Sequence, residues 1–244
     1  MKLIDDLIES ERSQLTDTQF TGVQFTGFVT SWQAVERYHT FLTTILDREA
    51  RATENYSNEL KAWMDTPPSP TRQLTELQRH RLDELSKTTD VLHLEIESFY
   101  LFANILLDTV ARAIEKYFGQ VRECSLDSHH NLINNFGKYV AQKKLAIPPH
   151  FMETAKRHRQ NITTFRDQEI AHGKRLNRVT ATALTKEGHA TMIATSTVVP
   201  TERFKPQADS IHVRELMSAV EEYIAAAIEI VKTNRDKGKL TFAE

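Results

Sequence analysis

The chain has 244 residues, of which 40% are apolar and 26% are charged, and its formal net charge is −2. This composition excludes a disordered chain, and the near-zero charge excludes general attraction to nucleic acid or an anionic membrane. The single cysteine, Cys124, excludes an internal disulfide and a zinc site built on cysteines. Asp5 and Asp6 interrupt the apolar start, and Asn104 and Asp108 interrupt the most apolar stretch. The sequence therefore predicts no signal peptide and no membrane span, and we expect a soluble, cytoplasmic protein.

Glycine and proline occur only seven times each, so long segments are free to form helices. Apolar residues spaced three and four apart predict a first amphipathic helix over residues 2–15. Residues 19–28, QFTGVQFTGF, contain Gln-Phe-Thr-Gly twice and predict a β-prone connector with two turns. A second helix is expected from about Thr30 to Met64. The prolines of residues 65–71, DTPPSPT, end it because they remove backbone donors and favour extended backbone.

A long helix is predicted from Leu74 to about Phe118, where Gly119 is a plausible stop, and a shorter one follows over 128–144. Another helix begins near His150, and a last one is expected over about 210–235. Between these two, β-branched runs predict one β-hairpin over about 179–199. The predicted fold is therefore all-α, a bundle of long helices with one β-hairpin inserted before the C-terminal helix. It divides into an N-terminal helical region, 1–70, and a bundle, 71–244, or forms one continuous domain.

The segment FRDQEIAHGKR sets Arg166 and His172 six positions apart, where a helical pattern ends at Gly173. On an ideal helix this spacing separates the two side chains by roughly 120°. They converge on one ligand only if the helix breaks near the glycine, or if a twofold axis supplies a second copy. An ordinary helix end is the alternative: Glu169 would pair with both residues, and Gly173 would cap the helix. The spacing alone leaves both interpretations open.

The same part of the chain is locally basic. Residues 156–178 contain seven basic residues but only two acidic ones, Asp167 and Glu169, although the whole chain has a net charge of −2. Such a concentration suits contact with phosphate groups, although a solvated basic face is the alternative. The basic residues are Lys156, Arg157, Arg159, Arg166, Lys174, Arg175 and Arg178.

The stretch RDQEIAHG resembles the signature of the HEPN superfamily (higher eukaryotes and prokaryotes nucleotide-binding domains), an Arg and a polar residue followed at short distance by a His. Arg166, Asp167 and His172 match this pattern, and Ala171 precedes the histidine as is common in the family. The resemblance covers the motif closely and residues 74–235 more loosely, while residues 1–70 lie outside it. It implies a small helical bundle that is usually dimeric. Many members are metal-independent ribonucleases of toxin–antitoxin and antiviral systems, and others are non-catalytic binding or dimerisation modules.

The resemblance also implies roles for individual residues. His172 would act as general acid or base, Arg166 would hold the scissile phosphate, and Asp167 would orient one of them. Contact with RNA would fall to Lys156, Arg157, Arg159, Lys174, Arg175 and Arg178. No metal or cofactor is required, and the expected partners are a second copy of the chain, RNA and a neutralising protein. Candidates for a supporting polar group, by composition alone, are Asn131, Asn134 and Asn135.

A rival interpretation starts from two Glu-x-x-His motifs, Glu36–His39 and Glu169–His172. Two such motifs with bridging glutamates from other helices form the di-metal site of ferritin-like bundles, because a spacing of three places both ligands on one helix face. The bridging candidates are Glu59, Glu95 and Glu97.

Overall fold

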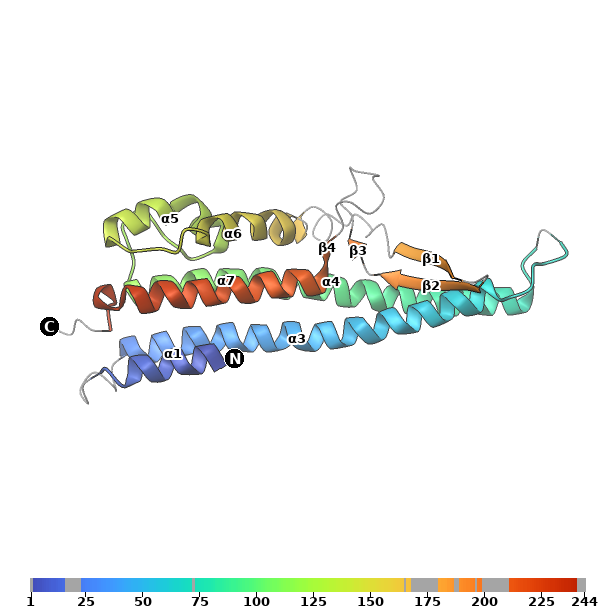
Figure 1. Cartoon of the computed structure of the whole chain (residues 1–244), viewed down its shortest axis with the longest axis horizontal. Helices are drawn as coiled ribbons and strands as arrows, with labels where there is room; N and C mark the ends of the chain where they lie inside the picture. The colour runs from blue at the N-terminus through green and yellow to red at the C-terminus, as the bar shows by residue number, and fades with distance from the viewer. Residues whose placement is uncertain are drawn as a thin grey trace. The chain divides into compact units, whose positions relative to one another are not determined.

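A computed structural model of the chain describes residues 2–15, 23–71, 73–164, 166–167, 180–186, 189–195, 197–198 and 211–240. The described residues are mostly helical, as predicted (Figure 1). The α-helices are α1 (Lys2–Arg12), α3 (Val23–Met64), α4 (Glu76–Phe118), α5 (His129–Lys143), α6 (Phe151–His158) and α7 (Val213–Thr233). A π-helical segment, Arg159–Thr163, follows α6, and a short 3-10 helix, Arg235–Lys237, follows α7. Within these ranges, none of the helices is both long and apolar enough to cross a membrane.

Among the described residues, four strands lie between α6 and α7 in the sequence. Strands β1 (Thr180–Lys186) and β2 (His189–Thr195) pair antiparallel, with Thr180 opposite Thr195. Strands β3 (Thr197–Val198) and β4 (Ile211–His212) form a second antiparallel pair. The turn residues 187 and 188 lie outside the described residues, so the hairpin predicted over 179–199 stays a prediction.

The chain forms two compact units, each made of several chain segments. Unit 1 comprises Met1–Leu42, Leu101–Thr164 and Met217–Glu244. Unit 2 comprises Thr43–Tyr100 and Phe165–Leu216. In unit 1, α5 and α6 lie beside α7 (Figure 1). The predicted division at residues 70 and 71 stays a prediction.

The core of unit 1 is built from the apolar stripes that the sequence predicts. Side chains spaced three and four apart face inward, and their burial stabilises the fold by about 25 cal/mol per Å² of apolar surface. The predicted stripe of α7 is confirmed, since each of its members is at most 3% exposed. Its members in unit 1 are Val220, Tyr223, Ile224, Ala227, Ile228 and Val231, and Leu216, the last residue of unit 2, precedes them on the same helix.

Helix α3 begins at Val23 rather than at about Thr30, so the predicted connector is wrong for residues 23–28. Phe25 is 5% exposed and Phe28 is fully buried, and their spacing continues into the buried Trp32. The ring of Phe28 packs against that of Tyr117 on α4, with centroids 5.4 Å apart. Burial of two aromatic rings outweighs the cost of Gly27 inside a helix, which is about 1 kcal/mol.

Two predicted helix ends are confirmed. Helix α4 stops at Phe118, and Gly119 takes a φ of 78°, a left-handed backbone that glycine adopts without strain. Helix α5 starts after Ser128, whose side chain accepts a hydrogen bond from the Asn131 amide.

Candidate functional site

Arg166 and Asp167 form an ion pair at the start of the predicted motif. The Nε and one Nη2 hydrogen of Arg166 are donated to the same carboxylate oxygen, Asp167 Oδ1, and the Nε contact measures 2.8 Å. The Arg166 side chain is 33% exposed and that of Asp167 is 47% exposed. A guanidinium has five N–H donors, and this carboxylate accepts from two of them, which leaves three that do not bond to Asp167.

The other half of the motif falls outside the described residues. This holds for His172, for its neighbours Glu169 and Gly173, and for the predicted RNA contacts Lys174, Arg175 and Arg178. Convergence of Arg166 and His172 on one phosphate therefore stays a prediction, as does the alternative of an ordinary helix end.

A π-helical segment precedes Arg166, a feature that the sequence did not indicate. The Thr164 amide donates to the Arg159 carbonyl five residues earlier, and the Thr164 hydroxyl donates to the same carbonyl at 3.0 Å. Thr163 Oγ1 donates to Asn104 Oδ1 at 2.9 Å, and this bond connects the segment to α4 within unit 1. Turns of this kind are rare and occur frequently at functional sites.

The basic residues predicted on α6 and just after it have different surroundings. Lys156 is exposed. Arg157 is also exposed, and its Nη2 lies 4.0 Å from Glu222 Oε2 of α7. Arg159 is half-buried, and its charge acts on His129 at the start of α5. Arg157 thus lies near a carboxylate of α7, whereas Arg159 is close enough to His129 of α5 to affect its pKa.

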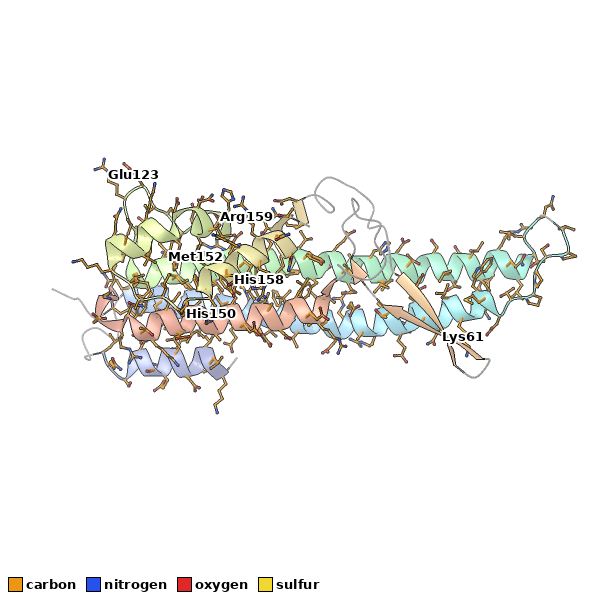
Figure 2. All side chains as sticks on the ribbon, turned by 45° about the horizontal axis from the view of Figure 1, so that its top comes forward. Lys61, Glu123, His150, Met152, His158 and Arg159 are labelled. Atoms are coloured by element: carbon orange, nitrogen blue, oxygen red, sulfur yellow. The ribbon has the colours of Figure 1, made fainter. Side chains whose placement is uncertain are left out.

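Three buried side chains of unit 1 form a cluster that sequence reasoning missed: His129 of α5, His158 of α6 and Tyr223 of α7. The two imidazole rings lie edge-on to the Tyr223 ring, with centroids 5.7 Å away for His129 and 5.4 Å away for His158. Each of the three side chains is at most 1% exposed. His158 Nε2 lies 3.0 Å from the Ala219 carbonyl oxygen of α7, and Figure 2 labels His158 and Arg159 at the end of α6. An N–H at Nε2 would satisfy this carbonyl.

Burial keeps both histidines of this cluster neutral. Burial is the main cause that lowers the pKa of His129 to about 3, and the proximity of His158, Arg159 and His130, which disfavours a further positive charge, contributes to the same shift. Burial also lowers the pKa of His158 to about 4, although the bond to Ala219 acts in the opposite direction. The pKa of the Tyr223 phenol is raised, mainly by burial and also by Asp108. Within the described structure, both ring nitrogens of His129 and the Tyr223 hydroxyl have no hydrogen-bond partner.

Two of the glutamates proposed for a di-metal site, Glu59 and Glu95, lie close to arginines. Glu95 Oε1 accepts a bond from Arg48 Nη2 at 2.6 Å, and Glu59 lies 3.6 Å from Arg81. His39 Nε2 lies 2.9 Å from Glu221 Oε1. Across the part of the chain that the structure describes, His, Cys, Asp and Glu form no group of three that could hold a metal ion.

The asparagines considered as supporting groups have local partners. Asn131 Nδ2 donates to Asp127 Oδ1 at 2.7 Å, and Asn135 Nδ2 donates to the Ser125 carbonyl at 3.1 Å. Asn134 contacts His130, one helical turn earlier. These bonds order the start of α5. Comparisons of the chain with protein-family models, with curated proteins and with solved structures find no match.

Proposed function

We propose that the chain is a HEPN-like, metal-independent ribonuclease that acts in a defence or toxin–antitoxin setting. The observation that carries this proposal is the Arg166–Asp167 pair, in which a carboxylate holds one edge of a guanidinium that is one-third exposed. An arginine restrained in this way presents a fixed cation with bidentate geometry, which suits a phosphate group.

The chemistry requires three events at the scissile phosphate: removal of a proton from the 2′-hydroxyl, stabilisation of charge on the phosphorane, and protonation of the leaving 5′-oxygen. Arg166 supplies the charge stabilisation in this proposal, and Asp167 limits its rotamers. His172 transfers the protons. A homodimer provides two copies of the motif, so that one histidine serves as base and the other as acid.

The RNA backbone is contacted in this proposal by Lys156, Arg157, Arg159, Lys174, Arg175 and Arg178. A neutralising protein restrains the activity, as in toxin–antitoxin pairs. In the proposed fold, one β-hairpin over residues 179–199 follows the motif in the chain and precedes the C-terminal helix.

The test is cleavage of single-stranded RNA by the purified chain in the presence of EDTA. We expect products that end in a 2′,3′-cyclic phosphate, and we expect His172→Ala to reduce their formation by roughly 10²–10⁴-fold. The matched control is His150→Ala, because His150 is an exposed histidine outside the motif. Activity that disappears with EDTA and returns with manganese or iron would favour a metal enzyme. A dimer that binds RNA without cutting it would favour a non-catalytic HEPN-like module.

A further inference from the structure

Three aromatic rings of unit 1 touch one another where α3 meets α4. Tyr38 and Phe41 of α3 have ring centroids 5.8 Å apart, and their planes are nearly perpendicular. Phe102 of α4 lies 5.5 Å from Phe41 and 6.3 Å from Tyr38. Each ring therefore contacts the other two, and we name these residues the aromatic triad.

The aromatic triad lies at the surface rather than in the core. Phe41 is 40% exposed, and Leu101, beside Phe102 in the chain, is 43% exposed. Tyr38 and Phe102 are half-buried. Phe99 and Tyr100, only a few positions earlier on α4, are at most 3% exposed, so aromatic residues of the same helix segment take clearly different positions. Several contacting apolar side chains at the surface form a patch, whereas a single exposed ring would need no explanation.

A cation is built into this patch. The guanidinium carbon of Arg37 lies 5.0 Å from the centroid of the Tyr38 ring, and its Nη2 lies 3.4 Å from the Tyr38 hydroxyl. An arginine at this distance is attracted to the face of the ring. Stacking therefore restrains the Arg37 charge at the edge of the aromatic triad.

Acidic residues are absent from the helix segments that carry the patch. The sequence has none between Arg37 and Asp47, and none from Ser98 to Leu107. Glu36 adjoins Arg37 in the chain, but its spacing of three places it on the same flank of α3 as His39. That flank faces α7, because His39 contacts Glu221 of α7. The aromatic triad and its cation thus lie on a different side of α3 from these carboxylates.

We propose that the aromatic triad and Arg37 form a stacking surface for the bases of single-stranded RNA. Surfaces of this class combine exposed rings, on which bases of any sequence stack, with cations that contact the backbone. A second copy of the chain fits less well, because an apolar partner would have to desolvate the Arg37 guanidinium without pairing it. The choice of RNA rests on the proposed function, whereas the surface itself rests on the contacts described above.

Binding is measured with a fluorescent 2′-O-methyl RNA oligonucleotide, which lacks the nucleophilic 2′-hydroxyl and therefore reports affinity without cleavage. Phe41→Leu should weaken binding roughly 5- to 100-fold, because leucine keeps the apolar contact but removes the π face. Phe41→Trp should retain wild-type affinity. Arg37→Gln should lower the salt dependence of the affinity by about one phosphate contact. Its matched control, Arg51→Gln, removes another exposed arginine of α3 and should change neither property.

Wild-type affinity for Phe41→Leu overturns the proposal, as does a change from dimer to monomer in this variant without loss of RNA binding. Should Phe41→Leu fold poorly, photo-cross-linking of a 4-thiouridine oligonucleotide to the wild-type chain decides instead. Adducts at residues 37–41 or 101–102 support the surface, and adducts confined to other residues overturn it. Binding that depends on Phe41 in a chain that never cuts RNA would refute the ribonuclease proposal alone. Cleavage with binding independent of Phe41 would refute only the stacking surface.

Discussion

Arg235 and Glu11 lie 224 positions apart in the chain, and Arg235 Nε donates a hydrogen bond to Glu11 Oε1 at 2.7 Å. The Glu11 side chain is only 2% exposed. Its second oxygen accepts a bond of 2.8 Å from the Tyr117 hydroxyl of α4. Helix α1, helix α4 and the 3-10 helix that follows α7 therefore meet at one buried carboxylate of unit 1.

Removal of Arg235 should destabilise the fold more than removal of the whole ion pair. Arg235→Met leaves the Glu11 charge buried without its cation, and we expect a loss of about 3 kcal/mol in the free energy of unfolding. The double variant Glu11→Leu/Arg235→Met should recover part of that loss, because no unpaired charge remains. Urea denaturation measures both values. Arg12→Met is the control, because Arg12 is exposed and its ion pair with Glu9 lies at the surface. An Arg235→Met protein as stable as wild type would contradict this account.

Stability should fall as the pH is lowered from 6.5 toward 3. The pKa of His129 is lowered to about 3 and that of His158 to about 4, from an ordinary value of 6.5. Between these values the unfolded chain binds more protons than the folded chain, so the stabilisation is complete above pH 6.5 and disappears as the pH falls through the folded pKa values. At pH 5 the free energy of unfolding should be lower than at pH 7 by about 2 kcal/mol for each histidine.

Urea denaturation at pH 7 and at pH 5 measures this effect. His129→Leu should reduce the difference in stability between the two pH values, because one buried titrating group is removed. His130→Gln, which changes the exposed neighbour, should leave the difference nearly as it is. Equal pH dependence in His129→Leu and wild type would show that His129 is not the group responsible.

Substitutions in the motif should separate catalysis from helix formation. His172→Ala should reduce cleavage by roughly 10²–10⁴-fold, as expected for loss of a proton-transferring group, with little change in melting temperature. Arg166→Lys keeps the charge but loses the planar fork that Asp167 holds, so cleavage should fall at least about tenfold. Single-turnover cleavage rates and melting curves on the same preparations provide the measurement. A His172→Ala chain that melts early yet cuts RNA at the wild-type rate would identify the segment as an ordinary helix end.

The chain should be a homodimer at micromolar concentration if the motif of each copy contributes to a shared site. Sedimentation velocity measures the oligomeric state. Adding an excess of inactive His172→Ala chains to wild-type chains should lower cleavage per wild-type chain, because each mixed dimer keeps only one of the two histidines that the shared site requires. A monomer that still cuts RNA would remove the shared-site mechanism.

The features of the fold that could be predicted from the sequence are those set by residues close together in the chain. The apolar positions of α7 and the stop at Gly119 could be read from the sequence, because helical periodicity and the left-handed freedom of glycine are local properties. The start of α3 could not, since Phe25 and Phe28 are held in a helix by burial, with Phe28 packed against Tyr117 of a distant helix. Glycine and threonine near these residues gave the opposite local signal.

The candidate site was only partly predictable for a similar reason. Arg166 and Asp167 were recognised from a short motif, and adjacent residues need no fold to bring them together. His129, His158 and Tyr223 come from three separate helices, and a buried polar side chain produces no periodic pattern of its own. Only Tyr223 had a signal, its place in the apolar stripe of α7.

The contact between Phe41 and Phe102 has a consequence for how the length of this chain can vary. Unit 1 breaks off after Leu42 and resumes at Leu101, so the two positions next to this pair of rings are the ends of an inserted segment, residues 43–100. Because those ends are adjacent in space, a connection of a few residues can join them at low entropic cost. The two helical runs between these ends can therefore gain or lose matched whole turns, while the packing of unit 1 is preserved.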